Sequence, residues 1–164
     1  FIGKPVTWPG NRTQFMNTLR DRFAALLSHG NGHVRSIAGQ MLSNLAPSAA
    51  PKTAQRDFGK ALAGTRDGKF VTARHILQSL WKFGLGGEDV RRALLDGLAE
   101  RFRQAEGEKN GTLVRFDIAT GLRALYDETG DETVRPTAVE LIALEQDAKY
   151  ARKYAGAWRG LMQS

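Results

Sequence analysis

Residues 34–45 have the sequence VRSIAGQMLSNL, and three later segments resemble it. These are ARHILQSLWKFG at 73–84, VRFDIATGLRAL at 114–125 and YARKYAGAWRGL at 150–161, so the starts lie 39, 41 and 36 residues apart. Each segment places apolar residues three and four apart, as on one face of a helix. Each also follows another amphipathic segment. The repeating unit is therefore a pair of helices, and this period is typical of two-helix repeats that stack.

Glycine and proline clusters divide the rest of the chain at helix-length intervals, and no segment alternates like a strand. We predict an all-α fold with about eight helices at 13–28, 33–46, 52–63, 69–83, 88–105, 112–127, 132–145 and 148–162. Short connections force consecutive helices to pack in four antiparallel pairs. We expect residues 13–164 to form one domain after an irregular segment at 1–12.

The four segments resemble the HEAT-repeat family, whose second helix often opens with Val-Arg. The arginine recurs as Arg35, Arg74 and Arg115 but is Ala151 in the last segment. The family's turn carries an aspartate three residues before the valine position, where this chain has Asp147 and, as a near match, Asn31. The resemblance implies an α-α superhelix, or solenoid, with the second helices on its concave side. It also implies a scaffold that binds other macromolecules.

Composition excludes several classes of protein. The 164 residues include 41% hydrophobic residues, enough for a sizeable core, and no cysteine. Disulfides, thiolate metal sites and a catalytic thiol are therefore excluded, and a reducing, cytoplasmic location fits best. Every apolar run is far shorter than the roughly 20 residues that span a bilayer. We expect no membrane association.

The net charge of +7 is unevenly distributed. Residues 1–87 contain 12 Lys and Arg against 3 Asp and Glu, and residues 88–148 contain 8 against 14. Residues 149–164 contain four cations and no acid. A basic surplus favours an anionic partner, because phosphates attract Lys and Arg regardless of sequence.

Aligning the four second helices predicts a binding surface. If positions 34, 37, 38, 41, 42 and 45 face the core, positions 36, 40 and 43 face outward. Position 43 becomes Lys82, Arg123 and Arg159 in the later segments, a cationic row of about 20 Å at ordinary helix spacing. Position 36 becomes His75, Phe116 and Arg152. We expect these six residues to contact an anionic partner on the concave face.

Other patterns offer weaker candidates for chemistry. His29 and His33 are four apart, but the intervening Gly30–Gly32 segment breaks the helical geometry of a metal pair. The glycine-rich residues 84–87 precede a helix but follow no strand, so a turn is favoured over a phosphate cradle. Acids at 127–132 suit a helix start better than acid–base catalysis. We expect no metal, no cofactor and no catalytic site.

Two further cationic patterns have competing interpretations. Lys52, Arg56 and Lys60 repeat every four residues, as on a solvated helix face. In the last helix Tyr150, Tyr154 and Trp158 alternate with cations, which suits either base stacking or the covered end of a core.

The function best supported by the sequence is a non-enzymatic scaffold that binds a protein or peptide. The alternative is nucleic-acid binding through the inner Lys and Arg residues. A DNA alkylation-repair glycosylase is a remote possibility, because some resemble this architecture, and Trp81 and Trp158 would then be the stacking residues.

Overall fold

The computed structural model describes residues 10–162, and within them it contains eight α-helices and no strand. The first four are α1 (Arg12–Leu26), α2 (Gly32–Leu45), α3 (Pro51–Ala63) and α4 (Phe70–Ser79). The last four are α5 (Glu88–Gln104), α6 (Gly111–Thr129), α7 (Val134–Ile142) and α8 (Ala148–Gly156). Three 3-10 helices, η1 (Ala46–Ser48), η2 (Gly64–Arg66) and η3 (Leu80–Gly86), occupy connections. The predicted all-α class is confirmed. Most of the segment predicted to be irregular lies outside the described residues.

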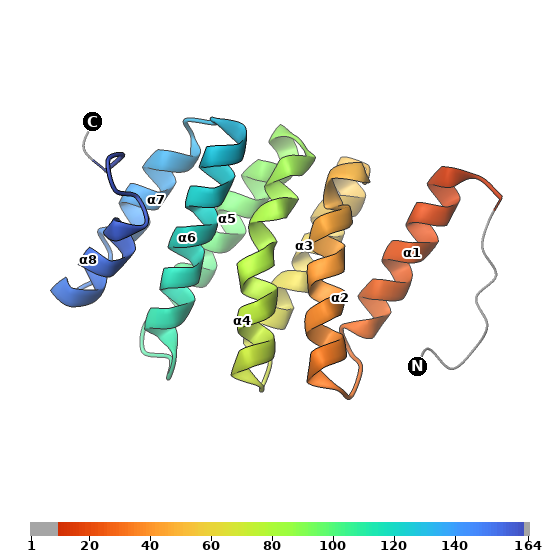
Figure 1. Ribbon diagram of the computed structural model, residues 1–164, viewed down its shortest axis with the longest axis horizontal. Coiled ribbons are helices and arrows are strands. Elements are labelled where there is room, and N and C mark those ends of the chain that lie inside the picture. The colour runs from red at the N-terminus through yellow and green to blue at the C-terminus, as the bar shows by residue number, and fades with distance from the viewer. Residues whose placement is uncertain (1–9, 163–164) are drawn as a thin grey trace.

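The helices lie in two layers. The even-numbered helices contact one another in the order α2, α4, α6, α8, and the odd-numbered helices contact one another in the order α3, α5, α7. Figure 1 shows the even-numbered helices in front of the odd-numbered ones, with α1 at the N-terminal end beside α2. Consecutive helices run in opposite directions, so all even-numbered helices begin at the same edge of the molecule. They therefore form one continuous layer of parallel helices.

The core lies between the two layers. The predicted core residues Leu42, Leu80, Leu122 and Trp158 are all buried, with exposed fractions of 0–1%. Aromatic rings from different helices join them, since Phe58 meets Phe83 edge to face and Phe102 meets Tyr154 in the same way. The predicted burial of these four residues is confirmed.

Three helices are shorter than predicted. Helix α4 ends at Ser79, where the hydroxyl donates back to the Ile76 carbonyl at 2.7 Å, a bond that competes with the helical pattern. The chain continues as η3 rather than as helix to residue 83. Helix α7 begins at Val134, because proline at 136 is tolerated only in a first turn. Helix α8 ends at Gly156 instead of reaching residue 162.

Two of the three predicted outward positions on α2 are wrong. Ser36 and Ser43 are buried, whereas Ile37, assigned to the core stripe, is 42% exposed. The reason is close packing against α4, because the hydroxyls of Ser43 and Ser79 lie 3.0 Å apart. A Cβ atom on Gly39 would lie only 2.8 Å from Ile76. Small residues thus turn this side of α2 toward its neighbour rather than toward solvent.

Helix α1 is held differently from the others. Its one fully buried side chain within the described residues is Arg20, which donates to Asn17 and to Ser48 in η1 at 2.8 Å each.

None of the helices in residues 10–162 combines the length and apolarity needed to cross a bilayer.

Candidate functional site

The sides of the even-numbered helices that point away from the odd-numbered layer form one face, which we call the outward face. Helical periodicity places these residues opposite the buried ones, and each is partly or fully exposed. The face consists of His33, Ile37, Gln40 and Asn44 on α2; Val71, His75, Gln78 and Lys82 on α4 and η3; Phe116, Thr120, Arg123 and Asp127 on α6; and Lys149, Arg152, Lys153 and Arg159 on and after α8.

Acidic residues are scarce in this layer. Helices α2, α4 and α8 and the segment η3 contain no Asp or Glu. The acids of α6 are Asp117, which is 2% exposed and paired with Arg74, Asp127, which is paired with Arg123 at 2.8 Å, and Glu128, which is exposed beside the outward face. The outward face as defined therefore has six Lys and Arg residues and one carboxylate. It is a surface suited to an anionic partner.

The six predicted binding residues all belong to the outward face, but they differ in how free they are. His75, Arg152 and Arg159 are exposed. Phe116 is half-buried, and the ammonium of Lys153 lies 4.9 Å from the centre of its ring. The prediction missed Lys149 and Lys153, because alignment at two positions per helix does not sample a whole helix side.

The predicted cationic row is interrupted by internal contacts. Lys82 donates from Nζ to Oδ1 of Asn44 at 2.9 Å. Arg123 donates to Asp127 and, at 3.4 Å, to the carbonyl of Ala157, and its guanidinium lies 5.9 Å from the Trp158 ring centre. These two side chains would have to leave existing partners before binding a ligand, whereas Arg159 would not.

Exposed apolar residues lie at the opposite end of the outward face. Val71 on α4 is 70% exposed and Ile37 on the adjacent α2 is 42% exposed. Within their bounds, α2 and α4 have no Lys, Arg, Asp or Glu on this face, and Lys82 follows α4 in η3. The outward face therefore combines exposed apolar and polar residues at α2 and α4 and is most cationic at α8.

Ion pairs tie each even-numbered helix to the next. Arg35 contacts Asp67 at 2.7 Å, Arg74 contacts Asp117 at 2.9 Å, and Arg115 contacts Glu145 at 3.0 Å. The three arginines are those that recur in the aligned segments, but the sequence did not predict that they form a series of ion pairs. The acids were missed because they do not lie at the aspartate position of the HEAT pattern. They come from the following helix or the turn before it, at variable spacing.

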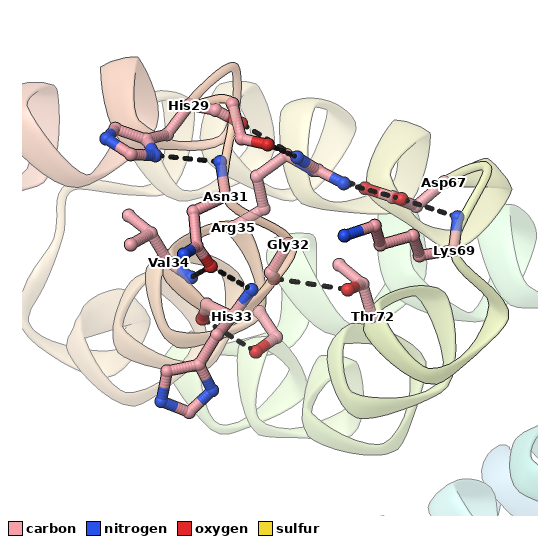
Figure 2. A network of polar contacts seen from close by, with 11 residues as sticks. His29, Asn31, Gly32, His33, Val34, Arg35, Asp67, Lys69 and Thr72 are labelled. Atoms are coloured by element: carbon pink, nitrogen blue, oxygen red, sulfur yellow. Dashed lines mark hydrogen bonds and ion pairs between the residues drawn. The ribbon is translucent and has the colours of Figure 1, made fainter.

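The start of α2 shows how local sequence builds one such junction (Figure 2). The Asn31 side chain accepts hydrogen bonds from the backbone N–H groups of His33 and Val34 and caps the helix. Arg35 donates to both carboxylate oxygens of Asp67 and also to the His29 carbonyl. The hydrogen bond from Arg35 holds the pKa of the Asp67 carboxyl below its ordinary value. The junction is therefore a structural one, filled by its own partners.

The other candidate sites are not assembled for chemistry. The Nδ1 atom of His29 accepts from the Asn31 N–H at 3.0 Å, and residues 10–162 hold no cluster of three or more His, Asp or Glu side chains that could bind a metal. Residues 84–87 close a turn, in which Gly87 has φ 115° and the Gly84 carbonyl accepts from Arg91. The Asp131 carboxyl has a pKa of about 2, because it accepts hydrogen bonds from the Thr133 side chain and backbone and from Arg91. This carboxylate stabilises the turn that leads into α7 by accepting hydrogen bonds from Thr133.

The aromatic residues of the last helix lie in the core. Tyr154 and Trp158 are 0% exposed, and the Trp158 indole donates to the Ala119 carbonyl at 2.9 Å. Neither ring can stack on a base without unpacking α8. Trp81 is half-buried beside Gly121. The covered-core interpretation of the last helix is thereby favoured over base stacking, and Trp158, one of the two tryptophans proposed for a glycosylase, is not accessible.

Comparison with known proteins leaves the family undetermined. No protein-family model matches the chain, and no curated protein or solved structure is similar to it.

Proposed function

We propose that this chain is a non-enzymatic binding scaffold, built as a HEAT-like solenoid, that recognises another protein or peptide through its outward face. The single observation that carries the proposal is the composition of that face. At the α8 end the face has four cations and no carboxylate, whereas Ile37 and Val71 are exposed at the other end. A surface that combines exposed apolar residues with a patch of one charge is typical of protein interaction sites.

The solenoid interpretation rests on two regularities of the molecule. Successive helix pairs stack so that each contacts its neighbours, as repeat proteins do. An arginine near the start of α2, α4 and α6 pairs with an acid of the next unit, which fixes the offset between units. The outward face would then be the concave surface that such repeats use for binding.

A protein partner is favoured over nucleic acid by the accessible side chains. Non-specific nucleic-acid sites combine cations with exposed aromatic rings, and here Tyr154 and Trp158 are buried. The α8 cations still support nucleic acid as the alternative function. That alternative requires an affinity that falls steeply with salt, by a log–log slope of about 0.9 per phosphate contacted on duplex DNA.

Selection of peptides from a random displayed library on the immobilised chain tests the proposal. Enriched peptides should lose about tenfold or more in affinity against the double variant Ile37→Ser/Val71→Ser, because the apolar anchors are lost. The matched control is Ala25→Ser/Ala63→Ser, two exposed positions on α1 and α3, away from the face. Peptides that bind both variants equally, or a library that yields no binder, would overturn the proposal.

A further inference from the structure

The cations of the outward face fall into two groups. Lys82 and Arg123 are already bound to Asn44 and Asp127. Arg152 and Arg159 have no carboxylate of residues 10–162 within 4.0 Å. Lys149 and Lys153 form no ion pair with a carboxylate of residues 10–162. Their ammonium groups lie 5.6 and 4.9 Å from the ring centres of Tyr150 and Phe116. The capacity to bind an anion is therefore concentrated on α8.

Helix stability accounts for only one of these four cations, Lys153, which lies in the last turn of α8 where the dipole favours positive charge. Lys149 stands in the first turn of α8, where the helix dipole disfavours positive charge. Lys149, Arg152 and Lys153 are three and four residues apart, a spacing at which like charges repel by a few tenths of a kcal/mol. Residues 148–162 contain no acid to offset the repulsion. Because the cluster weakens its own helix, we infer that the cations are present to bind a partner.

The local geometry leaves room for a ligand between the two arginines. Arg152 and Arg159 line an open hollow whose other walls include Gly156, Gly160 and Met162. A Cβ atom built on either glycine would meet nothing within 4 Å. The opposite side of α8 is fixed, because Tyr154 and Trp158 are fully buried. The hollow therefore lies between the end of α8 and the turn that follows it, and the buried Tyr154 and Trp158 anchor both segments, as a preorganised site requires.

We propose that Arg152 and Arg159, flanked by Lys149 and Lys153, form a subsite for clustered carboxylates on an acidic peptide segment of a partner protein. A guanidinium binds a carboxylate through two parallel hydrogen bonds, so two arginines bracket adjacent acidic side chains. This subsite deepens the proposed function and rests on it. The apolar part of the same partner would contact Ile37 and Val71, so the charge pattern also fixes the direction in which the partner lies across the even-numbered helices.

The subsite is tested with the full chain and a fluorescein-labelled hexaglutamate peptide at low ionic strength. The variant Arg152→Glu/Arg159→Glu should lose about tenfold or more in affinity. The control Lys52→Glu/Lys60→Glu makes the same change in net charge at exposed positions of α3 and should lose less than about twofold. Hexaglutamine, which has the same length without the charge, should not bind. Unchanged circular dichroism spectra would show that both variants are folded.

Three outcomes would overturn the subsite. Equal losses in the two variants would show attraction to net charge rather than a site. Absence of hexaglutamate binding would show no site for carboxylates. Tighter binding of a DNA duplex, lost in the same α8 variant with a steep salt dependence, would assign the cluster to phosphates. If library-selected peptides need Ile37 and Val71 but are indifferent to Arg152 and Arg159, the scaffold function stands and the subsite alone is wrong.

Discussion

Helices α2 and α8 stand at opposite ends of the even-numbered layer and differ in the charge of their outward sides. Each begins after a residue whose side chain accepts hydrogen bonds from two backbone N–H groups, Asn31 for α2 and Asp147 for α8. Each buries large apolar residues between the layers, Leu42 in α2 and Trp158 just after α8. Outward, however, α2 has no Lys, Arg, Asp or Glu, whereas α8 has a cluster of cations. Capping and burial therefore build the fold, and neither constrains the side chains on the outward face.

The largest expected effects come from the inward sides of the two helices. Replacing Leu42 with Ala should lower the free energy of unfolding by about 2–5 kcal/mol, and replacing Trp158 with Ala by about 3–5 kcal/mol. The second change also leaves the Ala119 carbonyl without its indole donor. Urea unfolding of each variant measures both values. A loss below about 1 kcal/mol at Trp158 would mean that α8 is not part of the common core.

The ion pairs at the two ends should differ in strength. Glu145→Gln should destabilise the fold by about 1–3 kcal/mol, because the side chain of Arg115 is 7% exposed and would remain buried without its counter-charge. Glu145 also accepts from the Tyr154 hydroxyl at 3.1 Å. Asp67→Asn should cost less, since the Arg35 side chain is 17% exposed. Equal or reversed losses, measured by urea unfolding, would contradict this ranking.

Acid should destabilise the protein at both ends. The pKa of Asp67 is lowered mainly by the hydrogen bond from Arg35. Burial raises the pKa of Glu145, but hydrogen bonds from the Asp147 backbone, Arg115 and Tyr154 outweigh it, so its pKa is also lowered. A carboxyl with a lowered folded-state pKa stabilises the fold above its unfolded pKa of about 4, and the contribution is lost as pH falls through the folded value.

Urea midpoints measured from pH 7 downward should therefore decline below about pH 4. Asp131, with a pKa of about 2, should extend the decline toward that pH, and Asp131→Asn should flatten this last part of the curve. An increase in stability on acidification would contradict the assignment of these carboxyls.

The smallest expected effects come from the caps. Asn31→Ala and Asp147→Ala should each cost about 1 kcal/mol, the ordinary value of a side chain that caps a helix start. Asp147 should cost slightly more, because its negative charge also complements the helix dipole. Thermal unfolding of the two single variants compares them directly. Identical losses would show that charge at this position adds nothing.

The sequence correctly predicted the features of the fold that depend on the helical period. It predicted the all-α class, the approximate helices and the burial of Leu42, Leu80, Leu122 and Trp158, because apolar spacing is set by the turn of the helix itself. It did not predict the rotation of α2 that buries Ser36 and exposes Ile37. That rotation depends on how closely α4 approaches, which is a property of two helices and cannot be seen in the pattern of one.

The positions of the six candidate binding residues were predicted for a similar reason, and their role in binding stays a prediction. All six do lie on the even-numbered layer, since each is opposite a core position. Lys82 binds Asn44, which is 38 positions away, and Arg123 binds the Ala157 carbonyl, which is 34 positions away. A local sequence pattern cannot predict contacts between residues so far apart. Lys153 was missed although it is visible in the sequence, because its place beside Phe116 depends on the neighbouring helix.

The small residues between α2 and α4 also make the shape of the outward face sensitive to changes that never touch it. A single methyl group at Gly39 would lie 2.8 Å from Ile76, so Gly39→Ala acts as a wedge between the two helices. Such a wedge would shift Val71 and His75 relative to Ile37 without altering any of these side chains. If the outward face binds a partner as proposed, buried substitutions between α2 and α4 would change which partner fits without altering any surface residue.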